Sequence, residues 1–106
     1  MDADLTGANL VDVQFWRADL TGAKLVGAIL VGVDLVEANL KGANLGWADL
    51  SQATLVHTNL EGANLNGCRV FGISAWAVRL NGAMPSNLII TSERESVIGS
   101  GLRSTT

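Results

Sequence analysis

The sequence has little of the chemistry on which many active sites depend. Its 106 residues include one cysteine, one histidine, one proline and no tyrosine, and aromatic residues make up only 5% of the chain. The single cysteine excludes an intrachain disulfide. Neither Cys68 nor His57 has a second residue of its own kind with which to share a metal ion. We therefore expect no metal site and no cofactor.

Strong charge of one sign and long hydrophobic runs are also missing. Seven basic against ten acidic residues give a formal net charge of −3, and no basic stripe suited to nucleic acid is present. The longest apolar run, residues 25–33, is far shorter than the roughly 20 residues that cross a bilayer. Asp2 and Asp4 follow Met1 almost directly, unlike a signal peptide. We expect no direct nucleic-acid binding, no membrane insertion and a cytoplasmic location.

What the sequence does contain is one motif repeated every five residues. Alanine, then aspartate or asparagine, then leucine recurs at Ala3-Asp4-Leu5, Ala8-Asn9-Leu10, Ala18-Asp19-Leu20, Ala38-Asn39-Leu40, Ala43-Asn44-Leu45, Ala48-Asp49-Leu50 and Ala63-Asn64-Leu65. In a helix, a step of five residues advances a side chain by roughly 140°, so the leucines would share no face. The alternation instead predicts a short extended side, and a glycine-rich pair such as Thr6-Gly7 predicts a type II turn.

This motif resembles the repeat of the pentapeptide-repeat protein family. The resemblance implies an all-β fold, a right-handed quadrilateral parallel β-helix in which four units form one coil. The repeat holds from Ala3 to about Gly82, which gives about four coils of four pentapeptides. We expect residues 1–83 to form the β-helix and residues 84–91 to cap or extend it. Residues 92–106 are either a polar, disordered tail, which their composition favours, or the end of a shortened relative of a longer protein. Residues 68–91 also resemble a junction in bacterial proteins where such repeats precede another domain.

The central apolar residues of the units are expected to stack inside the tube. This core stack consists of Leu5, Leu10, Phe15, Leu20, Leu25, Leu30, Leu35, Leu40, Leu45, Leu50, Leu55, Leu60 and Leu65. Cys68 takes an inward position where alanine is the norm, so we expect a small buried side chain and not a nucleophile. No two carboxylates of the motif stack at twenty-residue spacing, so a catalytic pair is not indicated. We expect no catalytic residue and no enzyme activity.

These features favour a structural or protein-interaction module whose specific role is unknown. The resemblance offers an alternative, since some family members bind type II topoisomerases such as gyrase and protect them from quinolones as acidic mimics of DNA. Over the repeats, seven acidic residues are offset by five basic ones. Four coils about 4.8 Å apart cannot then approach the density of duplex DNA, about one charge per 1.7 Å. The charge pattern disfavours the mimic.

Two features indicate where a protein partner would bind. The outward column Trp16, Val36, Val56 and Trp76, here called the Trp/Val strip, is apolar throughout at twenty-residue spacing. It is either an interface or exposed surface without a partner, and Trp76 can also cap the last coil. The tube ends expose unpaired backbone. We expect a homodimer through a tube end or through this strip, while the sequence identifies no other protein partner.

Overall fold

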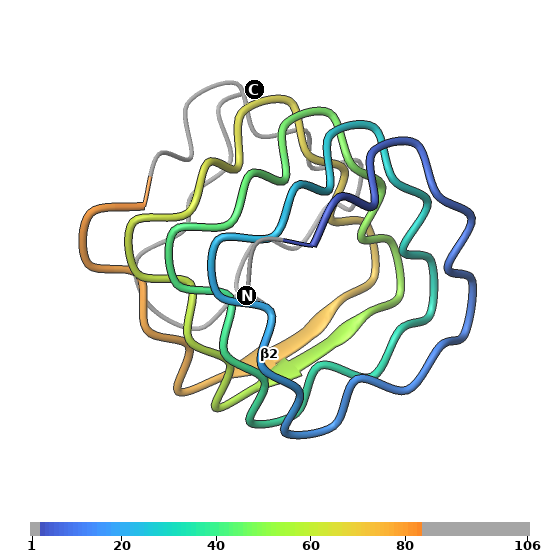
Figure 1. The fold of residues 1–106 in the computed structure, drawn as a ribbon. Helices are drawn as coiled ribbons and strands as arrows, with labels where there is room; N and C mark the ends of the chain where they lie inside the picture. The colour runs from blue at the N-terminus through green and yellow to red at the C-terminus, as the bar shows by residue number, and fades with distance from the viewer. Residues whose placement is uncertain (1–2, 84–106) are drawn as a thin grey trace.

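A computed structural model describes residues 3–83, in which the chain winds around a common axis (Figure 1). Residues twenty positions apart pair through parallel β-bridges, such as Asp4 with Lys24 and Lys24 with Asn44. The N–H of Leu5 donates to the C=O of Lys24 at 2.7 Å, and the N–H of Lys24 donates to the C=O of Ala3 at 2.7 Å. We call each twenty-residue winding a layer, counted from residue 3. The predicted segments 84–91 and 92–106 lie outside the described residues.

A four-residue turn closes the five-residue units, with a bend in place of the hydrogen-bonded turn at Ala77. In the first turn the N–H of Ala8 donates to the C=O of Leu5 at 3.0 Å, and the intervening Gly7 has a φ of 70°. This geometry fits the predicted type II turn. The corresponding residue has a positive φ in all sixteen units, but only nine of these residues are glycine. The other seven, with φ between 55° and 62°, are Asp12, Arg17, Glu37, Trp47, Gln52, His57 and Ala77.

Aspartate and asparagine recur in the motif because their side chains complete the turns. Oδ1 of Asp4 accepts the N–H of Thr6 at 3.2 Å, and Oδ1 of Asn44 accepts the N–H of Gly46 at 3.0 Å. These Asx turns give a partner to a backbone donor at the corner. Asparagine also connects layers, since Nδ2 of Asn64 donates to Oδ1 of Asn44 at 3.1 Å. The outward amide therefore stabilises both the corner and the stack.

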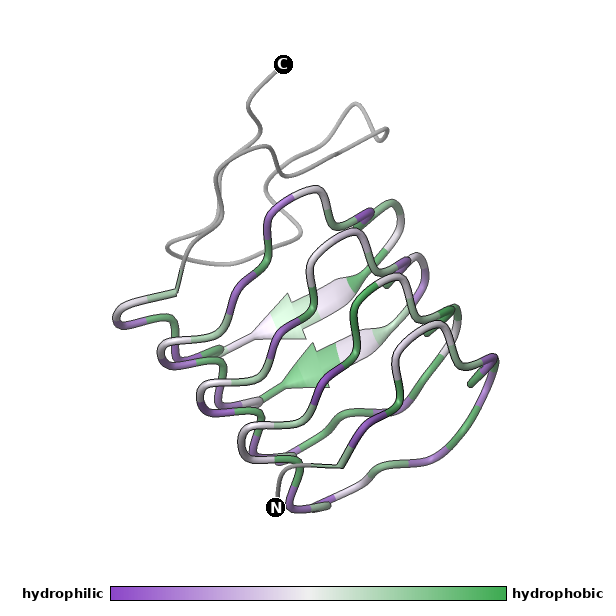
Figure 2. Cartoon of the chain, turned by 45° about the horizontal axis from the view of Figure 1, so that its top comes forward, coloured by the Kyte–Doolittle hydropathy of each residue, from purple (hydrophilic) through white to green (hydrophobic). Residues whose placement is uncertain are grey.

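The leucines of the motif point into the interior of the winding, as predicted. From Leu20 to Leu65 every member of the core stack is buried, with 0–8% of its surface exposed. Leu5, Leu10 and Phe15 pack against this core but remain partly exposed, because among the described residues a neighbouring layer covers them on one side only. Figure 2 shows hydrophilic and hydrophobic residues alternating along every layer. The repeat thus encodes one continuous apolar interior.

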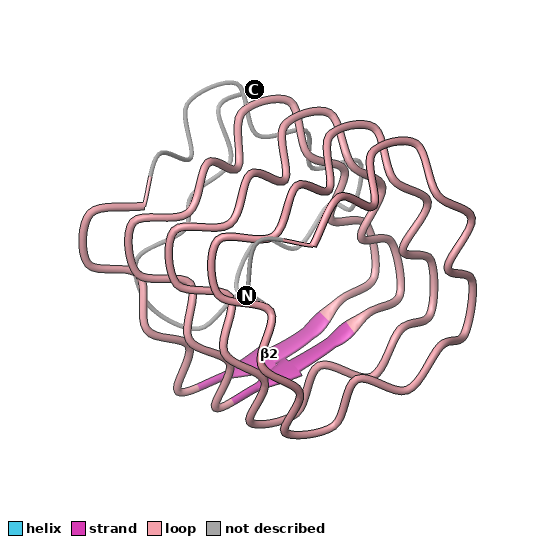
Figure 3. Ribbon diagram, viewed as in Figure 1, coloured by secondary structure: helices cyan, strands magenta, loops and turns pink. Residues whose placement is uncertain are grey.

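Regular strands are fewer than the repeat predicts. Within residues 3–83 the strands are β1 (Thr54–Val56) and β2 (Ser74–Trp76), which pair in parallel with Leu55 opposite Ala75 (Figure 3). The other sides make isolated bridges, because a turn ends the extended backbone after so few residues. The same part of the chain contains no helix with the length and apolarity that a membrane crossing requires.

Candidate protein-interaction surface

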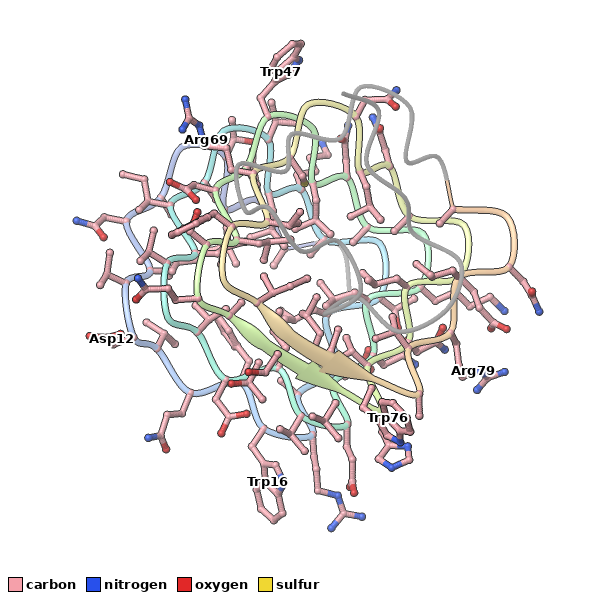
Figure 4. The ribbon with its side chains drawn as sticks, turned by 180° about the vertical axis from the view of Figure 1, so that it is seen from behind. Asp12, Trp16, Trp47, Arg69, Trp76 and Arg79 are labelled. Atoms are coloured by element: carbon pink, nitrogen blue, oxygen red, sulfur yellow. The ribbon has the colours of Figure 1, made fainter. Side chains whose placement is uncertain are left out.

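The Trp/Val strip lies along one corner of the winding. Trp16 and Trp76 expose 59% and 69% of their surface, and Val36 and Val56 are partly exposed. Figure 4 shows Trp16 and Trp76 projecting away from the ribbon on the same side of the molecule. Val56 and Trp76 are direct neighbours in the pairing of β1 with β2. The structure places all four residues in one outward column, and Trp76 projects away from the layers instead of folding over them.

Hydrogen bonds and a cation–π contact order this corner. The N–H of Arg17 donates to the C=O of Val36 in the next layer at 2.9 Å, and the same bond recurs in the two following layers. The guanidinium carbon of Arg17 lies 5.4 Å from the ring centroid of Trp16, and Arg17 Nε lies 3.2 Å from Glu37 Oε1. An exposed ion pair adds little stability. Its effect here is to orient Arg17 beside the Trp16 ring.

The residue after each strip residue distinguishes this corner from its neighbour. These residues are Arg17, Glu37, His57 and Ala77, and their φ values lie between 55° and 59°. A left-handed conformation costs a residue with a Cβ about 1–2 kcal/mol, a cost that glycine avoids. At the next corner the same position is glycine in every layer, at Gly22, Gly42, Gly62 and Gly82. The strip's corner keeps four side chains where glycine would be more favourable, and such backbone outliers cluster at functional sites.

Trp47 is an exposed aromatic residue that the sequence interpretation did not single out. It exposes 67% of its surface and lies on the side of the molecule opposite Trp16 (Figure 4). A Cβ added to Gly67 would meet Trp47 Cε3 at 2.5 Å, so the indole covers that glycine in the next layer. The signal in the sequence is a tryptophan at a turn position that glycine holds in the other three layers of this corner. Trp47 therefore stands alone, unlike the strip.

Cys68 and His57 occupy the positions that the repeat predicts. Cys68 is 0% exposed, and its thiol Sγ donates to the C=O of Leu45 at 2.9 Å. Burial raises the pKa of the Cys68 thiol to about 12, so almost no thiolate exists at neutral pH. His57 is exposed at the strip's corner. Within the described part of the chain, no three His, Cys, Asp or Glu side chains are grouped closely enough to hold a metal ion.

Parallel pairing at twenty-residue spacing, a turn every five residues and a leucine-lined interior define a β-helix solenoid built from short repeats. The family profile described as Pentapeptide repeats matches this chain in eight copies, over residues 1–35 and 34–70. The chain belongs to the pentapeptide repeat family, as the motif predicts.

Solved structures of this family also match. A pentapeptide repeat protein from the Arabidopsis thaliana thylakoid lumen is 30% identical over 76% of this chain and 57% of its own, with a TM-score of 0.56. Rfr23 from the cyanobacterium Cyanothece 51142 is 38% identical over 82% of this chain and 63% of its own, with a TM-score of 0.45. A pentapeptide repeat protein from Nostoc PCC 7120 is 34% identical over 77% of this chain and 64% of its own, with a TM-score of 0.48. This chain therefore spans less than two thirds of each of these proteins. No curated protein matches.

Proposed function

We propose that this chain is a non-enzymatic protein-interaction module that binds a partner protein through the Trp/Val strip. The scaffold in this proposal is a right-handed quadrilateral β-helix of four coils. Sixteen turns at five-residue spacing support four sides for each twenty-residue layer. The right hand is supported by the general chirality of connections between parallel strands, about 98% of which are right-handed.

The observation that carries the proposal is the uninterrupted apolar column beside four side chains in the left-handed conformation. The neighbouring outward column reads Thr21, Lys41, Glu61 and Asn81, so the scaffold itself does not require apolar residues at a corner. Tryptophan is also enriched among the residues that contribute most to binding at protein interfaces. An exposed surface without a partner would gain nothing from keeping Trp16 and Trp76 on the same edge.

The DNA-mimic alternative has no comparable support. Within residues 3–83, seven acidic side chains are interspersed with five basic ones. Arg17 pairs with Glu37 at 3.2 Å and Arg79 pairs with Glu61 at 3.0 Å, which neutralises part of the acidic surface. The gyrase-binding role and the cytoplasmic location stay predictions from the sequence.

Replacement of one strip tryptophan tests the proposed function. Immobilised wild-type protein, Trp16→Ser and the matched control Trp47→Ser are each exposed to extract of the source organism, and captured proteins are quantified. We expect Trp16→Ser to weaken binding of the captured partner by about 30-fold, the equivalent of a 2 kcal/mol hot spot. Trp47→Ser, which removes an equally exposed indole on the opposite side, should bind as the wild type does. Equal capture by all three proteins, with unchanged circular dichroism, would contradict the proposal.

A further inference from the structure

We propose that one partner is a second copy of this chain, bound antiparallel through the face next to the Trp/Val strip. This inference rests on the proposed interaction role, because the strip forms one edge of that face. The face, here called the fourth face, consists of three outward columns that run through the layers. They are Arg17, Glu37, His57 and Ala77; Asp19, Asn39, Asn59 and Arg79; and Thr21, Lys41, Glu61 and Asn81.

The charges in two columns of the fourth face are arranged symmetrically about its middle. In the central column, Asp19 in the first layer mirrors Arg79 in the fourth. In the corner column, Lys41 in the second layer mirrors Glu61 in the third. Each residue thus has a residue of opposite charge at the same distance from the boundary between the second and third layers.

The strip has the same symmetry, while the column beside it has the symmetry in part, since Arg17 mirrors the uncharged Ala77. Trp16 mirrors Trp76 and Val36 mirrors Val56, so the strip has the same residues when read from either end. In the column beside it, the carboxylate of Glu37 mirrors the imidazole of His57. The apolar edge and the charged face therefore share one centre of symmetry.

A two-fold axis in the plane of contact, perpendicular to the winding axis, makes use of this symmetry. With this axis, each column of one copy faces the same column of the second copy, which runs in the opposite direction. Such a self-complementary contact is typical of a symmetric dimer. Asp19 then faces Arg79 of the second copy, and Lys41 faces Glu61 of the second copy. The tryptophans at the two ends of the strips come together as pairs, an arrangement that aromatic rings favour. Asp19 and Glu61 thus each meet a basic residue, and no two like charges face each other.

The parallel arrangement is much less favourable. A two-fold axis along the winding axis would place each residue of the central column opposite itself. Asp19 would face a second Asp19, and Arg79 would face a second Arg79. Like charges brought together across an interface suppress an association. The parallel arrangement keeps a contact of opposite charges between Lys41 and Glu37, but only the antiparallel dimer avoids like-charge contacts altogether, so the charge order favours it.

The geometry within one copy already prepares a charge network for the dimer. Arg79 Nη2 lies 3.0 Å from Glu61 Oε2, and the Glu61 side chain is only 20% exposed, so its carboxylate is held in place. Figure 4 shows Arg79 projecting beside Trp76 at the edge of the molecule. In the dimer, Lys41 of the second copy approaches this ordered carboxylate. The result is an alternating set of charges that spans both copies.

The size of the face sets the expected strength of the dimer. Four layers at about 4.8 Å each give a contact about 19 Å long. Such a contact belongs to the small interfaces, below about 1,200 Å² of total buried area, that support weak association. We therefore expect a dimer that forms at tens to hundreds of micromolar, roughly −5 to −6 kcal/mol.

A charge swap measured by sedimentation velocity tests the proposal. The wild type is studied at low salt from about 10 μM to about 1 mM, where a dimer of this strength would populate. In the dimer, Lys41→Glu makes position 41 of each copy face Glu61 of the other, which gives two contacts between like charges. Glu61→Lys likewise gives two contacts between like charges, with Lys41. Each single variant should therefore raise the dimer Kd about tenfold. The double variant Lys41→Glu/Glu61→Lys restores opposite charges and should return the Kd to near the wild-type value. Lys24→Glu makes the same charge change on another side and serves as the control.

The outcomes separate this inference from the proposed function. A wild type that stays monomeric at about 1 mM would overturn the dimer. So would a double variant as weak as the single variants, because in the parallel arrangement Lys41 lies across from Glu37 and the swap restores nothing. The swap leaves the strip intact. If the wild type is monomeric yet captures a protein through Trp16, the dimer is wrong and the proposed function stands.

Discussion

Truncation of one interior leucine measures how the core holds this solenoid together. Leu35 is 2% exposed and belongs to the same column as Phe15 and Leu55. Leu35→Ala removes three carbon atoms from this column. At about 0.8 kcal/mol for each buried carbon, the transfer cost alone is about 2.4 kcal/mol.

The layers on either side have little freedom to close the resulting cavity. The N–H of Leu35 donates to the C=O of Thr54 at 2.9 Å, and the N–H of Asp34 donates to the C=O of Val13 at 3.1 Å. These bonds fix the spacing between layers, so a cavity term adds to the transfer cost. We expect Leu35→Ala to lower the free energy of unfolding by about 3–4 kcal/mol, and the midpoint of thermal unfolding by about 12–30 °C.

The assay is thermal unfolding followed by circular dichroism, with two comparison variants. Val36→Ala trims the next residue, which is partly exposed at the corner, and should cost less than about 1 kcal/mol. Leu5→Ala makes the same chemical change as Leu35→Ala in the partly exposed first layer, and should fall between the two. Equal shifts for Leu35→Ala and Val36→Ala would refute the assignment of inward and outward positions.

Two further predictions concern single positions. Burial raises the pKa of Cys68 to about 12, so the thiol should resist alkylation by iodoacetamide at pH 8 in the folded protein and react fully after denaturation. Prompt labelling of the folded protein would contradict this burial. Gly67→Ala and Gly27→Ala both place a Cβ at positive φ, which should cost each variant about 1 kcal/mol. Only at Gly67 does the new Cβ also displace the Trp47 indole, so only that variant should change the tryptophan fluorescence, and identical spectra would be inconsistent with the contact.

The interior of this fold follows from the sequence because the same residue does the same work in each layer. Leu25, Leu45 and Leu65 are all 0–1% exposed, so the burial of one of them predicts the burial of the other two. The glycine turns follow for the same reason, since Gly7, with a φ of 70°, shows what the repeat requires at that position. Regularity of this kind lets periodicity alone predict packing.

The departures from the repeat were harder to predict because tertiary contacts determine them. Arg17 adopts a φ of 59° although propensity assigns that region to glycine, and its N–H donates to the C=O of Val36 just as the N–H of Gly22 donates to the C=O of Lys41. The bond between layers thus imposes one backbone conformation on both residues. Thr58 places a hydroxyl inside the core with 0% exposure. Its Oγ1 donates to the C=O of Leu35 at 2.7 Å, which satisfies the buried group. No property of threonine alone indicates that this carbonyl is within reach.

The most informative position for function is the first residue of each turn. The two inward residues of a unit pack, the outward Asp or Asn bonds the turn, and the second turn residue must accept a positive φ. The repeat requires none of these duties of the first turn residue, so its identity is the least constrained by the scaffold. At one corner it is tryptophan, valine, valine and tryptophan, and at the next it is threonine, lysine, glutamate and asparagine. The two corners also differ in backbone, because side chains follow the strip at positive φ where glycine follows the other column. Neither difference is required by the five-residue repeat, and the contact proposed above gives both a physical reason.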